Sequence, residues 1–221
     1  MAAPIRQTFE AQLAQLTQDV VRMGSMASHV VQLALQMLTE RDLSLGDQVM
    51  ATENAIDALN LDIESRAVQL LALQQPMAGD LRTITAVLRI ITDIERIGDY
   101  SVDIGRQARL LADQPLFKPL EDIPRMGQLV QRMLHDTLEA FITRDLPLAS
   151  QAVAQDDEVD HAYRSLHQDL TAYMMSNPSL IGQAIALLLV GTYLERIADH
   201  ITNIGERVWY MATGQLKELH E

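Results

Sequence analysis

Apolar residues recur along this chain at spacings of three and four, which is the repeat of one face of an α-helix. β-branched residues do not alternate with polar ones, so the pattern predicts no strand. Two clear helical runs are Val30, Leu33, Ala34, Met37 and Leu38, and Val87, Ile90, Ile91, Ile94 and Ile97. The chain is therefore predicted to be all-α.

Seven prolines divide the helical pattern, because proline is tolerated in first turns and loops but breaks helix interiors. One further break carries no proline; it follows Arg41, where Asp42 or Ser44 can cap the next helix. The expected helices span residues 6–40, 44–73, 78–112, 122–143, 147–175 and 179–213.

Short motifs recur in the two halves of the chain at offsets of 100 to 103 residues. They pair Arg41-Asp42-Leu43 with Arg144-Asp145-Leu146, Pro76 with Pro178, and Glu95-Arg96-Ile97-Gly98-Asp99 with Glu195-Arg196-Ile197-Ala198-Asp199. Helices joined by short loops pack antiparallel. The repeat thus predicts two tandem antiparallel three-helix bundles, at residues 1–113 and 120–221, joined by a linker around Pro115–Pro124.

Composition narrows the function classes. The 221 residues include 30 acidic and 17 basic side chains, for a net charge of −13, and no cysteine. This balance disfavours binding to nucleic acid or to anionic lipid, and the missing cysteines exclude disulfides and thiolate metal sites. The N-terminus has no secretory pattern. The most apolar run, Ile181–Leu194, is too short for a membrane span of about 20 residues. A soluble cytoplasmic protein is expected.

Acidic residues four apart on a helix lie on one face. In each half, one such pair precedes the hairpin proline and another follows it at a nearly equal number of residues. Two antiparallel helices therefore bring the two pairs to the same height along the bundle axis. Each bundle is thus expected to gather four carboxylates on facing helices. They are Glu53, Asp57, Glu95 and Asp99 in the first half, and Asp156, Asp160, Glu195 and Asp199 in the second.

Two interpretations of these carboxylates remain open. Four gathered negative charges repel, and a hard cation such as magnesium, calcium, manganese or iron would offset that repulsion. Alternatively the carboxylates lie on solvated helix faces, with Arg96 and Arg196 neutralising the glutamates. His200, beside Asp199, is either an extra ligand or a neighbour.

The chain resembles the PhoU family along nearly its whole length. The residues that carry this resemblance are Pro76-Met77-Ala78-Gly79-Asp80-Leu81-Arg82, Asp93-Ile94-Glu95-Arg96-Ile97-Gly98-Asp99 and Leu194-Glu195-Arg196-Ile197-Ala198-Asp199. The resemblance implies a duplicated three-helix bundle. It also implies clusters of iron or zinc, with magnesium or manganese as further candidates, held by the eight carboxylates above. Asp103 extends the first ligand set, and Asn203 is its uncharged equivalent in the second.

The same resemblance implies a non-enzymatic repressor of the phosphate-starvation response and a modulator of phosphate uptake. Such a protein would link a phosphate ABC transporter to a sensor histidine kinase, act as a homodimer, and reach the inner membrane only through these partners. Two rival hypotheses are a protein that stores metal or catalyses a reaction with it at the same carboxylates, and a purely structural helical scaffold.

Overall fold

The computed structural model describes residues 2–74, 76–113 and 115–219. Over these residues the chain forms seven α-helices and two short 3-10 helices. Their bounds are α1 Ala2–Thr39, η1 Leu43–Leu45, α2 Gly46–Gln74, α3 Ala78–Leu111, α4 Asp122–Thr143, α5 Leu146–Ala154, α6 Asp156–Ser176, η2 Pro178–Leu180 and α7 Ile181–Thr213. The expected all-α class is confirmed, and the predicted ends of the repeats at residues 1 and 221 lie outside the described residues.

The helix predicted over residues 147–175 is present but is interrupted at Gln155, which divides it into α5 and α6; together these two segments form one helix of the second three-helix unit. The backbone N–H of Gln155 bonds to the carbonyl of Ala152 at 3.2 Å, which tightens the last turn of α5. The side chain of Gln155 donates to Asp136 on α4 at 3.2 Å. Neither proline nor glycine marks this break. The signal that could have revealed it is the acidic first turn of α6, which favours a helix start.

The turns that precede the second helix of each repeat have the same local structure. Arg41 and Arg144 both take left-handed backbone conformations, with φ of 59° and 58°. The next residue caps the helix that follows: Asp42 accepts from the N–H of Ser44, and Asp145 from the N–H of Leu148, both at 3.0 Å. The cap predicted at Asp42 is therefore confirmed, and the sequence repeat is also a structural one.

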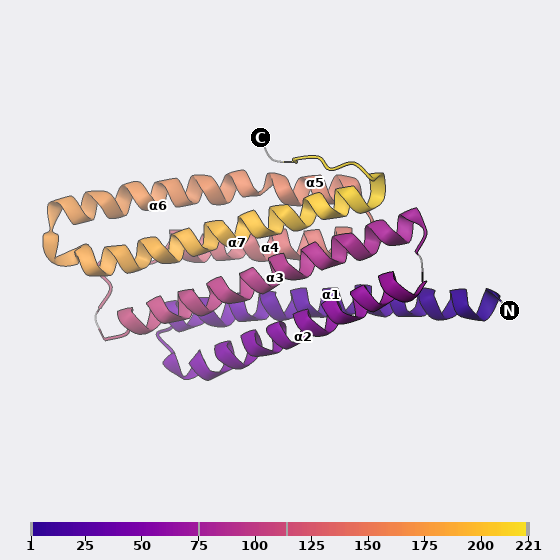
Figure 1. The fold of residues 1–221 in the computed structure, drawn as a ribbon. Coiled ribbons are helices and arrows are strands. Elements are labelled where there is room, and N and C mark those ends of the chain that lie inside the picture. Colours follow the sequence, from indigo (N-terminus) through magenta and orange to yellow (C-terminus); the bar gives the residue numbers. More distant parts are fainter. Residues whose placement is uncertain (1, 75, 114, 220–221) are drawn as a thin grey trace.

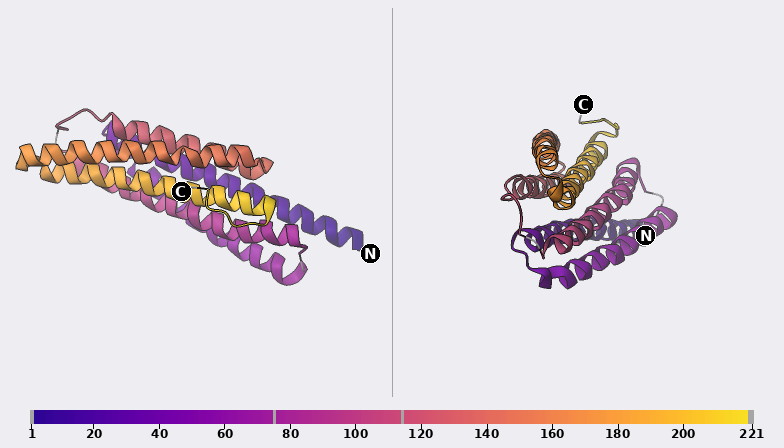
Figure 2. Two further views of the ribbon diagram at one scale, coloured as in Figure 1. Left: turned by 90° about the horizontal axis from the view of Figure 1, so that it is seen from above. Right: turned by 90° about the vertical axis from the view of Figure 1, so that its left-hand side faces the viewer.

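The two three-helix units lie side by side, with α3 and α7 packed together along the middle of the molecule (Figures 1 and 2). Helices α1 and α2 cover one side of this central pair, and α4, α5 and α6 cover the other. Helices α1 and α4 also meet directly. The sequence repeat thus becomes an approximate twofold arrangement, in which equivalent helices face each other across the middle of the molecule.

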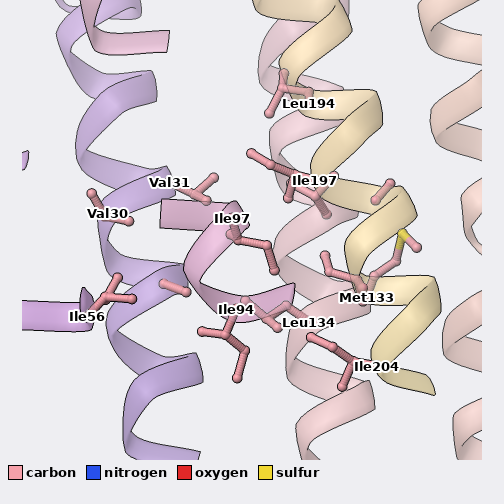
Figure 3. Close-up of a cluster of buried hydrophobic side chains, with 14 of the residues drawn as sticks. Val30, Val31, Ile56, Ile94, Ile97, Met133, Leu134, Leu194, Ile197 and Ile204 are labelled. Carbon is pink, nitrogen blue, oxygen red and sulfur yellow. The ribbon is translucent and has the colours of Figure 1, made fainter. Parts of the chain in front are cut away.

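One hydrophobic cluster runs through both repeats. Its centre includes Ile94 and Ile97 of α3 and Ile197 and Ile204 of α7, all fully buried. Figure 3 shows these side chains together with Val30 of α1 and with Met133 and Leu134 of α4. Because the same cluster contains side chains from both units, the repeats share a core and stabilise each other.

Helices α1 and α4 approach closely through two equivalent glycines. A Cβ atom built on Gly24 would lie 2.5 Å from a methyl carbon of Leu138, and one built on Gly127 would lie 2.3 Å from a methyl carbon of Leu35. Gly24 and Gly127 are equivalent in the repeat, and so are Leu35 and Leu138. Each leucine therefore occupies the space that a side chain on the opposite glycine would need.

Helix α7 is apolar and long enough to pass for a membrane span by length and composition. It packs instead against α3, α4, α5 and α6, and its buried face includes Leu187, Val190 and Leu194. It is therefore the core helix of the bundle, as expected for Ile181–Leu194. The first turns of α7 remain partly uncovered, with Ile181 and Ile185 exposed.

Candidate functional site

The first group of carboxylates lies where α2 faces α3. Glu53 and Asp57 project from α2, and Glu95, Asp99 and Asp103 from α3. Glu53, Asp99 and Asp103 line one pocket of about 340 Å³. The antiparallel register predicted from the distances to Pro76 therefore does bring the two helices' acidic residues together.

The electrostatics of these glutamates reflect both their burial and the neighbouring carboxylates. Partial burial raises the pKa of Glu53, and the nearby charges of Asp57, Asp99 and Glu95 raise it further. The pKa of Glu95 is raised in the same way, first by burial and then by Asp99. Negative charges on both helices thus make ionisation of these glutamates harder.

The second group is arranged in the same way where α6 faces α7. Asp156 and Asp160 project from α6, and Glu195 and Asp199 from α7. Burial raises the pKa of Glu195, and Asp199, Asp160 and Asp156 add to that effect. Asp156 itself is buried at the start of α6. Both repeats therefore present one four-carboxylate group.

Arginines partly offset the charge of the first group. Arg96 approaches Glu95 at 3.4 Å and Asp99 at 2.9 Å, and Arg106 pairs with Asp103 at 2.6 Å. Arg196 has a different neighbour: its guanidinium lies over the ring of Tyr100, 5.8 Å from the ring centre. The predicted neutralisation by arginine is thus direct for Arg96, whereas Arg196 only partly offsets the raised pKa of Glu195.

The oxygen donors suit a hard cation by their chemistry, since carboxylates are the ligands that magnesium, manganese and iron accept. Their side chains are not gathered as a ready-made cage. Among the described residues, no three His, Asp or Glu side chains stand close enough together to hold a metal ion. A cation bound by Glu95 and Asp99 would compete with Arg96 for these carboxylates.

Two residues considered as ligands also make contacts between the repeats. His200 and Asn203 of α7 both contact the same carboxylate oxygen of Asp93 on α3, at 2.9 and 3.3 Å. Tyr193 and Tyr100 occupy the positions that the repeat relates to Asp93 and His200. Their rings stack, with centres 5.9 Å apart. Asp93 and the two tyrosines were not predicted as site residues, because nothing in a single sequence shows which residues of α3 face α7.

The Asp80-Leu81-Arg82 motif, in place of which the second repeat has Leu180-Ile181-Gly182, ties two helix ends to α3. Asp80 lies 3.0 Å from the guanidinium of Arg6 on α1. Arg82 donates to the carbonyl of Met211 at 3.4 Å, near the end of α7. Gly214, in a left-handed conformation, terminates α7 beside the Arg82 side chain. The motif therefore acts on packing at this end of the molecule.

The raised glutamate pKa values predict a specific pH dependence of stability. Each of these glutamates has a higher pKa in the folded protein than in the unfolded chain, where it is about 4.3. Such a group lowers the free energy of unfolding as pH rises from the unfolded-state pKa through the folded-state pKa. We expect the triple variant Glu53→Gln/Glu95→Gln/Glu195→Gln to match the parent protein below that range. At pH 7 it should be more stable, by about 0.2–0.5 kcal/mol for each like-charge pair removed.

Urea denaturation of both proteins at pH 4 and pH 7 measures this difference. The matched control is Glu64→Gln/Glu139→Gln/Glu158→Gln, which removes three exposed glutamates outside the two groups. A stability difference that shrinks toward neutral pH would contradict the prediction.

Together the fold and its paired acidic groups define a class: a duplicated helical-bundle protein in which each repeat presents four carboxylates on two facing helices. The chain matches the PhoU domain twice, over residues 20–108 and 123–208. The chain belongs to the PhoU family.

Relatives resemble the chain over nearly its whole length. A phosphate-specific transport system accessory protein PhoU homolog from Caulobacter vibrioides is 40% identical over 94% of this chain and 91% of the relative. One from Clostridium acetobutylicum is 34% identical over 98% and 99%. The crystal structure of PhoU from Pseudomonas aeruginosa matches with a TM-score of 0.90 and 31% identity, over 94% of this chain and 100% of that one. The duplicated fold is thus found in solved structures.

Proposed function

We propose that this protein is a cytoplasmic, non-enzymatic repressor of the phosphate-starvation response that links a phosphate ABC transporter to a sensor histidine kinase. The observation that carries the proposal is near-full-length similarity to proteins named as accessory to phosphate-specific transport. A similar solved structure, from Streptococcus pneumoniae, is of a phosphate transport system regulatory protein, with a TM-score of 0.88 and 29% identity over 95% of this chain and 99% of that one.

The molecular surface is consistent with such a role. A net charge of −13 disfavours direct docking on anionic lipid, so the protein would reach the inner membrane through its partners. The two repeats share one hydrophobic core and form an elongated unit. Its opposite ends and faces are separate surfaces on which two partners could bind. We include a homodimer in the proposal; light scattering should then give twice the mass of one chain.

The test is alkaline phosphatase activity in cells grown with abundant phosphate. Deleting the gene should raise this activity to the level of phosphate-starved cells, because the repressing signal no longer reaches the kinase. A plasmid copy should restore repression, and deleting the kinase as well should abolish the increase. Unchanged activity in the deletion strain would contradict the proposed role.

A second proposal concerns metal. Burial first, and then neighbouring carboxylates, raise the pKa values of Glu53, Glu95 and Glu195, which supports the presence in each group of negative charge that a cation would offset. We propose that the groups bind iron or zinc, with magnesium or manganese as alternatives, and that metal fixes the facing helices. The ligands would be Glu53, Asp57, Glu95, Asp99 and Asp103 in the first repeat, and Asp156, Asp160, Glu195, Asp199 and Asn203 in the second.

Metal content measured by mass spectrometry after purification tests this assignment. The double variant Asp99→Ala/Asp199→Ala should lose most of the bound iron or zinc, since it removes one carboxylate from each group. The control Glu64→Ala/Glu158→Ala removes two exposed acidic side chains and should keep the parent's content. Equal content in the parent and Asp99→Ala/Asp199→Ala would show that the site is wrong. Metal-dependent turnover lost in that variant would instead favour a metalloenzyme.

A further inference from the structure

An apolar groove lies in the first repeat, beside the acidic pocket but distinct from it. It has a volume of about 390 Å³, within the range of sites that hold a ligand or an anchoring side chain. Helices α1, α2 and α3 all contribute to it. Its floor consists of buried, apolar or small residues: Met37, Val49, Val102 and Gly105.

The second repeat provides an internal comparison, because the equivalent space there is filled. Val153 of α5 is 1% exposed, and one of its methyl carbons would lie 2.5 Å from a Cβ built on Gly205. The equivalent residue of α2, Met50, is 45% exposed at the rim of the groove. A Cβ built on Gly105 would meet nothing closer than the sulfur of Met37, at 3.5 Å. The groove is therefore a feature of the first repeat and not of the shared fold.

The rim of the groove is basic, in a chain that is strongly acidic overall. Arg106 and Arg109 line it, and no lining residue is acidic. The equivalent residues of the second repeat are Glu206 and Trp209. The exposed side chain of Arg109 makes no ion pair or hydrogen bond within the described part of the chain. Its guanidinium lies over the start of α2, where a Cβ on Gly46 would be 3.2 Å away.

The apolar surface continues past the groove. Leu110, 71% exposed, lines this groove and also a second one that includes Ile185 of α7. Exposed apolar surface that extends beyond one cavity suits a macromolecular partner better than a small molecule, which would be enclosed. The neighbouring acidic pocket shares Met50, Val102 and Arg106 with the groove, but Arg109 does not line it. Arg109 is therefore the guanidinium available to a ligand carboxylate.

We propose that this groove binds a segment of a partner protein in which an apolar side chain is followed closely by a carboxylate. The apolar side chain would occupy the space above Gly105 and Val102, and the carboxylate would pair with Arg109. Guanidinium groups bind carboxylates through two parallel hydrogen bonds, and buried apolar anchors contribute much of the affinity of such interfaces. The inference goes beyond the regulatory role proposed above and does not depend on it.

Selection of a phage-displayed library of random 12-residue peptides on the intact protein tests the proposal. Enriched peptides should share a leucine, isoleucine, methionine or aromatic residue within one helical turn of an Asp or Glu. Arg109→Glu should weaken a synthetic consensus peptide about tenfold or more, because an attractive charge becomes repulsive. Gly105→Leu, whose Cβ would meet nothing closer than 3.5 Å, should fill the groove and weaken the peptide similarly.

Arg132→Glu is the matched control, since it makes the same charge change on an exposed residue of α4 and should leave the affinity unchanged. The proposal is overturned if no peptides are enriched, if they lack the apolar–acidic pairing, or if they bind Arg109→Glu as tightly as the parent. Binding of decanoate at Arg109 without any enriched peptide would also overturn it, in favour of a small-anion site. Phosphatase activity plays no part in these outcomes, so this proposal and the regulatory one fail separately.

Discussion

Replacing Ile97 with alanine should lower the free energy of unfolding by about 2–5 kcal/mol, the usual cost of truncating a fully buried isoleucine. Ile197→Ala should cost a similar amount, because Ile197 is equally buried at the equivalent position of α7. Both side chains belong to the cluster that runs through the two repeats. We therefore expect each variant to destabilise the whole protein and not only its own half.

Urea denaturation followed by circular dichroism measures both effects. The parent and the two variants should each unfold in a single transition, with the midpoint shifted to lower urea in the variants. Leu61→Ala is the control: Leu61 is 65% exposed on α2, so its truncation should change stability by less than about 0.5 kcal/mol. Two separate transitions, with only one moved by Ile97→Ala, would mean that the repeats unfold independently.

Introducing valine at Gly24 or Gly127 should cost about 1–3 kcal/mol for each substitution, because a side chain there must displace a packed leucine. The double variant Gly24→Val/Gly127→Val should be less stable than either single variant. The repeat relates the two positions, so the single variants should be affected to a similar degree. Melting temperatures measured by calorimetry give the comparison.

Gly79 and Gly182 make suitable controls for this pair, since a Cβ at either would have nothing within 4 Å. Valine at these positions, in the first turns of α3 and α7, should change stability by no more than about 0.5 kcal/mol. If Gly24→Val and Gly127→Val were equally harmless, close packing of α1 against α4 would not contribute to holding the repeats together.

Much of the fold could be predicted from the sequence because local signals agreed with one another. Apolar spacing placed the helices, prolines placed most of the breaks, and the repeated motifs related the two halves. The register of the facing helices followed from distance to Pro76 alone, since equal rise per residue brings Glu53 opposite Asp99. The structure places both residues in one pocket.

What could not be predicted depends on how each helix is rotated and on which helices meet across the repeats. The contacts of Asp93 with His200 and Asn203 join residues more than a hundred positions apart, and no pattern in the sequence predicts them. The different neighbours of Arg96 and Arg196 are another example: the motif is shared, but Arg96 pairs with Asp99 whereas the guanidinium of Arg196 lies over the ring of Tyr100. Side-chain partners of this kind are set by tertiary packing.

The groove is open in the first repeat and filled in the second, and this difference bears on how a duplicated bundle can evolve. In an assembly of two identical three-helix chains, every substitution appears twice, so a cleft opened in one subunit is opened in the other. Covalent fusion removes that constraint. One half can keep Val153 in this space, and Trp209 in place of an arginine, while the other presents Met50 and Arg109 at the same positions. A tandem chain can thus carry a binding function in one half and leave the other to maintain the scaffold.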